Sequence, residues 1–256
     1  MNLPGEATGR GKKIFSFAGI WVVAKKDFLE MVNSPVAYVL YVIFLLVTGY
    51  FFSQPLFVLN QASMAPFMDL VPLILVFLVP AVAMRSFSEE IKSGTFEILA
   101  TLPLRVYEIV IGKYLAVVGL VGIAMMLTGI YPIVLEFLGR PDWGAVIGAY
   151  LGNLFLIAAL AAMGIFASSL TKNQITAYLI SWVIGFALFL AGKVIIFFPY
   201  PLSALVSFLG FDSHMENIAR GVLDSRDILY FLSLSAFFLA LPLVRFEKRL
   251  RGSYAE

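Results

Sequence analysis

The chain has 256 residues, of which 61% are hydrophobic and 13% charged, with a formal net charge of +2. Soluble domains hold about 25% charged residues, so this composition indicates a protein whose main solvent is the lipid bilayer. The mean hydropathy of +0.94 agrees with that reading. Cysteine is absent, which excludes disulfides and thiolate chemistry, and the single histidine, His214, excludes a site with several histidine ligands.

The N-terminal part of the chain is predicted to lie outside the hydrocarbon core. Residues 1–13 are polar and are expected to form a disordered cytoplasmic segment without a signal-peptide cleavage site. Residues 14–34 carry an apolar stripe at helical spacing, with Phe17, Trp21 and Phe28 on it, which predicts an amphipathic helix along the membrane interface. Pro35 ends that helix and turns the chain into the bilayer.

Six later stretches are apolar enough to cross the hydrocarbon core, which takes about 20 helical residues. We predict these spans at residues 36–53, 67–84, 109–136, 146–170, 175–198 and 228–244. The predicted fold class is therefore an all-α polytopic membrane protein with a six-helix transmembrane domain over residues 35–245. A basic cytoplasmic tail is expected at residues 246–256.

The distribution of lysine and arginine predicts the orientation of the spans, because these residues are retained on the cytoplasmic side. Most of the 18 basic residues fall in the N-terminal segment, in the loop after the second span and in the C-terminal tail. The opposite side holds only Arg140, Arg220 and Arg226. We therefore predict that the protein lies in the cytoplasmic (inner) membrane with both termini on the cytoplasmic side.

A polar, charged segment at residues 86–105 separates the second and third spans and is predicted to form a short cytoplasmic hairpin. Ser86 and Glu89 have the spacing of a capping box that would begin a helix as the chain leaves the membrane. Gly94 interrupts this helix, and a second short helix is expected before Pro103. The residues alone leave two interpretations open, a contact that inserts into a cytosolic partner and an ordinary solvated loop.

Between the fifth and sixth spans, residues 199–227 are too polar to cross the bilayer and are expected to lie outside or to re-enter slightly. Ser213 and Glu216 form a second predicted capping box, which places a short helix at residues 215–220 with His214 in its first turn. A packed or exposed histidine and a ligand or pH-sensing role are both open for His214.

Two ionisable residues near the spans are candidates for a membrane-embedded function. Lys193 falls inside the predicted fifth span, where it could extend to the headgroups, line a cavity or pair with an acid. Glu136 ends the third span and is expected to mark the membrane boundary.

The chain is not expected to hydrolyse ATP itself. A phosphate-binding loop requires the pattern G-x-x-x-x-G-K-[ST] after a strand. The stretch GRGKK at residues 9–13 resembles it only in part, because lysine stands where Ser or Thr would hold magnesium. Any ATP-driven role would need a second polypeptide.

Three stretches together carry a family resemblance. EEIKSGTFEILATLPLRVYEIVIGKYL, at residues 89–115, resembles the coupling region of ABC-2 type permeases, the membrane subunits of ATP-binding-cassette transporters. KKDFLEMVNSPVAYV, at residues 25–39, is similar to the elbow helix and the start of the first span in that family. FDSHMENIARGVLDSRDILYFLSL, at residues 211–234, resembles the gliding-motility GldF-like branch and, more loosely, the NosY-like branch.

The resemblance implies an ABC-2 (type V exporter-like) permease fold and a non-enzymatic membrane subunit that forms a homodimer. Two copies of a cytosolic ABC ATPase would dock beneath it and carry the ATP and magnesium, and no cofactor or nucleic acid would bind this chain. The implied ATPase-coupling positions are Glu89, Glu90, Gly94, Thr95, Phe96, Glu97 and Leu99. The implied elbow-helix positions are Lys25, Asp27 and Glu30.

The sequence leaves the task of such a permease open between two alternatives. One is transport of a substrate across the membrane, with export expected. The other is a scaffold that passes ATPase-driven motion to an extracytoplasmic machine, through an accessory protein, without translocation. A membrane enzyme is disfavoured because the predicted spans carry almost no clustered acids or nucleophile-base pairs, and an independent carrier is disfavoured because no internal repeat is visible.

Overall fold

The structure is a computed structural model of the 256-residue chain. It describes residues 17–57, 64–95, 104–139, 141–194, 199, 202–219 and 224–253. The predicted disorder of residues 1–13 and most of the predicted second hairpin helix lie outside the described residues.

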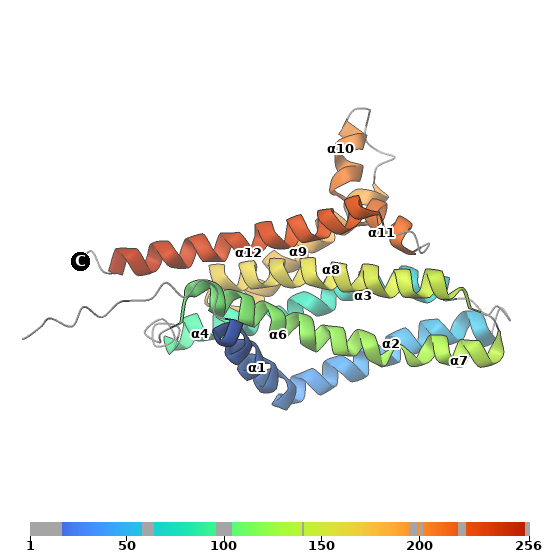
Figure 1. The fold of residues 1–256 in the computed structure, drawn as a ribbon, viewed down its shortest axis with the longest axis horizontal. Helices are drawn as coiled ribbons and strands as arrows, with labels where there is room; N and C mark the ends of the chain where they lie inside the picture. Colours follow the sequence, from blue (N-terminus) through green and yellow to red (C-terminus); the bar gives the residue numbers. More distant parts are fainter. Residues whose placement is uncertain are drawn as a thin grey trace, which may run out of the picture.

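Within the described ranges every regular element is a helix (Figure 1). The helices are α1 (Phe17–Asn33), α2 (Pro35–Phe57), α3 (Ala65–Ala83), α4 (Arg85–Ser93), α6 (Val106–Leu127), α7 (Ile130–Leu138), α8 (Trp143–Leu170), α9 (Gln174–Lys193), α10 (Leu202–Leu209), α11 (Phe211–Ala219) and α12 (Ser225–Ser253). Six segments are long and apolar enough to cross a membrane: α2, α3 with α4, α6 with α7, α8, α9 and α12. The predicted all-α fold with six spans is confirmed.

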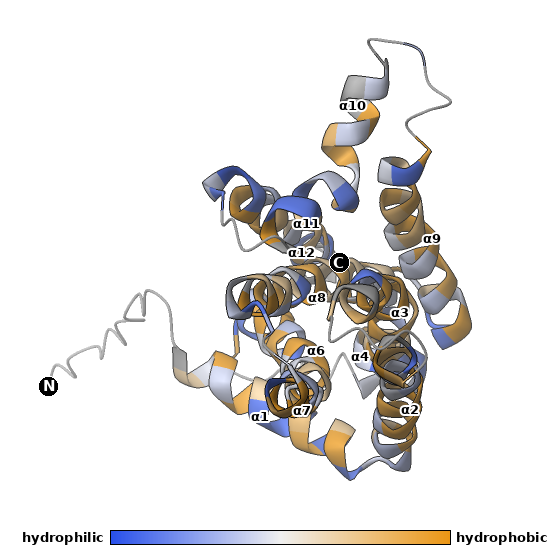
Figure 2. Ribbon diagram, turned by 90° about the vertical axis from the view of Figure 1, so that its right-hand side faces the viewer, coloured by the Kyte–Doolittle hydropathy of each residue, from blue (hydrophilic) through white to orange (hydrophobic). Residues whose placement is uncertain are grey.

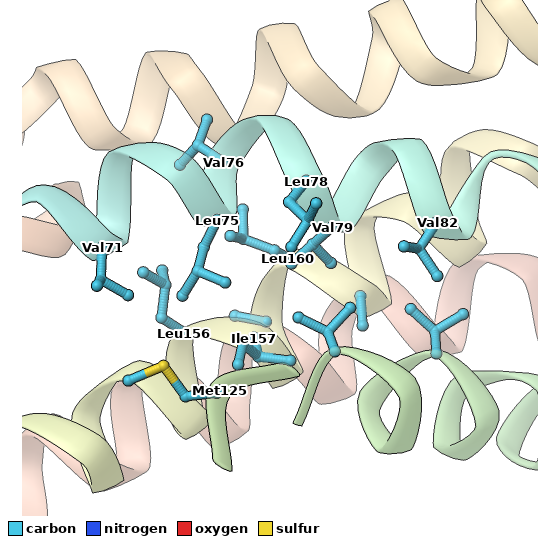
Figure 3. Close-up of a cluster of buried hydrophobic side chains, with 14 of the residues drawn as sticks. Val71, Leu75, Val76, Leu78, Val79, Val82, Met125, Leu156, Ile157 and Leu160 are labelled. Carbon is cyan, nitrogen blue, oxygen red and sulfur yellow. The ribbon is translucent and has the colours of Figure 1, made fainter. Parts of the chain in front are cut away.

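Helix α8 is the central helix of the bundle and contacts α3, α6, α9, α11 and α12. Figure 3 shows the core where side chains of α3, including Leu75 and Val79, meet Leu156 and Leu160 of α8. Figure 2 shows hydrophobic residues along the bundle helices and a hydrophilic stretch on α11. In Figure 1, α4 and the C-terminal end of α12 lie at the left end of the bundle, which we call the α4 end.

The predicted third span is broken into α6 and α7 at Thr128 and Gly129. Pro132 has no N–H to donate to the Thr128 carbonyl four residues earlier, and its ring crowds that position. The Thr128 hydroxyl donates to the Met125 carbonyl at 2.6 Å, which secures the end of α6. The break therefore follows from the proline that the sequence places inside the span.

The predicted capping box at Ser86 and Glu89 is wrong. Helix α3 passes into α4 through Met84, whose backbone (φ −56°, ψ −29°) stays helical. The first turn of α4 therefore has a helical turn before it, and Ser86, Phe87 and Ser88 are buried in the bundle. The second span runs on as a helix to Ser93, where Gly94 ends it with a left-handed backbone (φ 75°) as predicted.

The predicted amphipathic helix is present as α1, and a face that the prediction did not describe is buried against the bundle. Trp21 is 68% exposed, whereas Ile20 and Val23 are buried against α6. Close approach is possible because Gly112 of α6 has no side chain: a Cβ there would lie 2.7 Å from the Cβ of Val23. Helix α1 is therefore docked on a membrane span as well as being amphipathic.

The segment between the fifth and sixth spans folds back onto the bundle. Helix α11 packs on α8 and α9, with Ile218 against Gly152, while α10 projects away from the bundle in Figure 1. The helix predicted at residues 215–220 begins earlier, at Phe211. The predicted cap is wrong because the Ser213 hydroxyl lies inside α11 and donates to the carbonyls of Ser207 and Gly210.

Candidate functional site

A buried ion-pair cluster joins three helices at the α4 end. Lys113 of α6 is 3% exposed, and its Nζ lies 2.8 Å from Oδ2 of Asp27 in α1. The same Nζ lies 2.7 Å from Oε1 of Glu90 in α4. One cation thus joins α1, the α4 continuation of the second span and the start of the third span. We call Lys113, Asp27 and Glu90 the ion-pair cluster.

The cluster also contacts an aromatic side chain that leads to the last span. The Nζ of Lys113 lies 5.3 Å from the centre of the Phe87 ring, within the range of a cation–π contact. The Phe87 ring in turn lies 4.9 Å from the ring of Phe246 in α12, and both rings are buried. Helix α4 therefore contacts α6 through Glu90 and α12 through Phe87, and it is linked to α1 through Lys113.

Close approach at a glycine brings α1 near α6 beside the cluster. A Cβ at Gly19 would lie 2.8 Å from the carboxyl carbon of Glu108. Glu108 is itself buried and accepts a hydrogen bond from the backbone N–H of Arg105 at 2.8 Å, which caps the start of α6. The Glu108 cap and the close approaches at Gly19 and Gly112 fix the position of α1 along α6, and Asp27 faces Lys113 in that position.

A cavity of about 220 Å³ lies directly against the cluster. Its lining combines charged residues of α1, α4 and α6 with apolar residues of α2, α3 and α6. The cavity is thus polar where it meets the ion-pair cluster and apolar along the spans.

The predicted coupling residues differ in their burial and contacts. Glu90 is turned into the bundle by Lys113, whereas Glu89 is exposed and lies 3.4 Å from the Gln174 side chain of α9. Gly94 and Thr95 are exposed at the end of α4. Phe96, Glu97 and Leu99 lie outside the described residues.

The three predicted elbow-helix residues divide in the same way. Lys25 and Glu30 are exposed, and Asp27 is 6% exposed. Lys113 was not among the predicted site residues. Its signal is a lysine seven residues into a helix that begins at Val106 and whose only other charged residue is Glu108, since such a charge is normally paired.

The two predicted polar membrane residues lie at helix ends. Lys193 is the last residue of α9 and of its candidate span, and its Nζ pairs with Oδ2 of Asp212 in α11 at 2.9 Å. Glu136 is exposed near the end of α7 and accepts a hydrogen bond from the Trp143 indole at 2.8 Å. Neither residue joins the ion-pair cluster.

His214 forms a separate buried pair where α11 meets α12. Its Nδ1 lies 2.7 Å from Oδ1 of Asp227, and its Nε2 lies 3.0 Å from the carbonyl of Phe208. The imidazole stacks on Tyr230 with ring centres 4.0 Å apart. His214 is thus a packed residue that ties the α10–α11 segment to the last span. No group of three or more residues suited to a metal ion occurs among the described residues.

Six apolar spans, with α1 docked on the third and a charged helix continuing from the second, define a multi-pass membrane protein. The sequence profile described as "ABC-2 family transporter protein" matches residues 21–250. The chain belongs to this family. It matches none of the curated proteins with which it was compared.

Proposed function

We propose that this chain is the membrane permease subunit of an ABC-2 transporter, forms a homodimer and couples to two copies of a separate cytosolic ATPase. The ATPase binds the ATP and magnesium, and the permease moves its substrate outward across the cytoplasmic membrane. Both termini and the α4 end lie on the cytoplasmic side. The GldF-like branch is part of the proposal and rests on residues 211–234.

The observation that carries the proposal is the ion-pair cluster directly behind the hairpin. Glu89, Gly94 and Thr95 are exposed at the end of α4, where a docked protein could touch them. Glu90, one residue after Glu89, is fixed to Lys113 and through it to Asp27. A push on α4 therefore reaches α1 and α6 through charge-assisted hydrogen bonds and reaches α12 through Phe87.

The coupling follows the logic of a population shift. ATP-driven closure of the ATPase stabilises one arrangement of the spans only if its contacts with the hairpin differ between the two arrangements. A short buried ion pair suits this role because separating its members leaves charges unpaired in the bundle, which costs about 3–5 kcal/mol. The cluster consequently moves as a unit.

The proposal is tested by affinity purification of the tagged full chain, co-expressed with an ATPase encoded beside it, in mild detergent. We expect an ATP-binding subunit in one-to-one ratio and ATP hydrolysis in the eluate. Changing Phe96→Ala together with Glu97→Gln should release the subunit. The matched control Glu136→Gln, at the opposite end of the bundle, should retain it. Purification of the chain alone, without ATPase, would refute the proposal.

A further inference from the structure

The cavity beside the ion-pair cluster extends from the α4 end toward the middle of the bundle. Lys113 lies at one limit of its lining, and Leu120 lies about 10 Å further along α6 at a rise of 1.5 Å per residue. Val36 and Leu40 of α2 and Val82 of α3 complete the apolar wall. A ligand that fills this cavity needs an apolar part as well as a polar one.

The polar end of the cavity contains hydrogen-bonding capacity that the protein does not use. Ser86 is 6% exposed, and its Oγ has no hydrogen-bond partner among the described residues. The Oε2 of Glu90 is buried and, in the same described part of the chain, is also without a partner. Both residues line the cavity. Buried groups of this kind are normally satisfied by protein, water or a bound group, so these two atoms are free to accept hydrogen bonds from an occupant of the cavity or to donate them to it.

The charged residues around the cavity indicate which charged groups its ligand should carry. Glu30 and Glu89 line the cavity in addition to Asp27 and Glu90, whereas Lys113 and Arg85 are its basic residues. Lys113 is already bound to two carboxylates. The remaining acids favour a cationic group that donates hydrogen bonds, and the exposed Arg85 favours an anionic group at the rim.

We propose that the cavity binds a phospholipid whose headgroup carries a primary ammonium, of the phosphatidylethanolamine class. The ammonium donates to Oε2 of Glu90 and Oγ of Ser86, the phosphate lies against Arg85, and the start of an acyl chain lies along Leu40 and Leu120. A soluble partner's lysine would satisfy the polar end but would leave the apolar wall empty. The proposal holds whether or not an ATPase docks at the hairpin.

Native mass spectrometry of the delipidated full chain in detergent tests the proposal. The probes are palmitoyl-oleoyl phosphatidylethanolamine, phosphatidylcholine and phosphatidylglycerol, and phosphoethanolamine without acyl chains. Phosphatidylethanolamine should bind about tenfold more tightly than phosphatidylcholine, whose ammonium cannot donate a hydrogen bond. Equal binding of the three lipids, a preference for phosphatidylglycerol, or no lipid binding would overturn the proposal. Equally tight binding of phosphoethanolamine would overturn the lipid assignment.

Matched variants locate the site. Arg85→Gln should weaken phosphatidylethanolamine binding about tenfold, and Ser86→Ala about fivefold. Lys92→Gln removes an exposed charge from the same helix outside the cavity and should leave binding unchanged. An equal loss with Lys92→Gln would show a general surface effect and contradict the assignment. The lipid comparison on the unchanged chain decides the question even if a variant fails to fold.

Discussion

Lys113 and Asp27 lie 86 positions apart in the chain, and a 2.8 Å ion pair joins them inside the protein. Asp27 belongs to a helix that precedes the first span, and Lys113 belongs to the third span. The pair therefore fixes α1 to the bundle of spans. Glu90 completes the cluster from the end of the second span.

Removal of the cation should destabilise the protein strongly. Lys113→Met leaves two carboxylates facing each other in a buried site and is expected to cost about 3–5 kcal/mol of unfolding free energy. The triple variant Asp27→Asn, Lys113→Met, Glu90→Gln removes all three charges and should recover most of the loss. Lys25→Met, at an exposed side chain of the same helix as Asp27, should change stability by at most about 0.5 kcal/mol. Thermal unfolding in detergent measures all three variants, and equal effects of Lys113→Met and Lys25→Met would contradict the account.

Close packing of α1 on α6 should depend on Gly112 but not on Gly119. A Cβ at Gly112 would lie 2.7 Å from the Cβ of Val23 and 3.0 Å from the Ile20 carbonyl oxygen. Gly112→Ala is thus expected to cost about 1–3 kcal/mol through overpacking. A Cβ at Gly119, on the same helix, would meet Phe28 at an ordinary 3.6 Å, so Gly119→Ala should be neutral or slightly stabilising. Unfolding curves in which both variants lose the same stability would argue against the close contact.

At the C-terminal end of α9, we expect the close backbone approach of Gly210 to Gly192 to contribute more to stability than the ion pair between Lys193 and Asp212. The side chains of Lys193 and Asp212 are 51% and 37% exposed, so solvent screens their pair and Lys193→Met should cost at most about 1 kcal/mol. A Cβ at Gly210 would lie 2.6 Å from the backbone N of Gly192. Gly210→Ala should therefore cost about 1–3 kcal/mol. A larger loss with Lys193→Met than with Gly210→Ala would reverse this ranking.

The His214 pair is expected to hold the α10–α11 segment on the last span. Both ring nitrogens lie beside acceptors, Asp227 and the Phe208 carbonyl, so Asp227→Asn exchanges a charged contact for a neutral one. The expected loss is about 1–3 kcal/mol, because Asp227 is buried. Asp69→Asn, at an exposed acid, is the control. Limited proteolysis of residues 199–223, compared between the two variants, reports whether the segment is released, and identical rates would count against the pair.

Composition and hydropathy predict the six spans because every membrane helix must satisfy the same length and polarity requirements. Hydropathy does not predict which face of α1 is buried. Trp21 is the larger apolar residue, yet Ile20 and Val23 are buried, because Gly112 of a distant helix admits them. Lys113 was not predicted as a site residue for a related reason, because its partners Glu90 and Asp27 lie 23 and 86 positions away in the chain.

The capping box at Ser86 shows the limit of a local pattern. Ser86 and Glu89 have the required spacing, but the preceding turn of α3 is helical, so α4 continues from α3 through Met84 without a side-chain cap. The break at Thr128 was within reach of the sequence, because Pro132 marks it. Tertiary contacts between distant helices, in contrast, cannot be read from spacing along one helix.

The most direct test of the account is an ATP-dependent distance measurement on the complex with the co-purified ATPase. The chain has no cysteine, so spin labels can be placed at Phe137→Cys in α7 and Leu229→Cys in α12, both exposed positions. We predict that ATP changes the label-to-label distance in the parental chain. In the triple variant without the ion-pair cluster, the ATPase should still bind but the change should disappear. An unchanged distance in the parental chain, or the same ATP-dependent change in the triple variant, would contradict the role of the cluster in coupling.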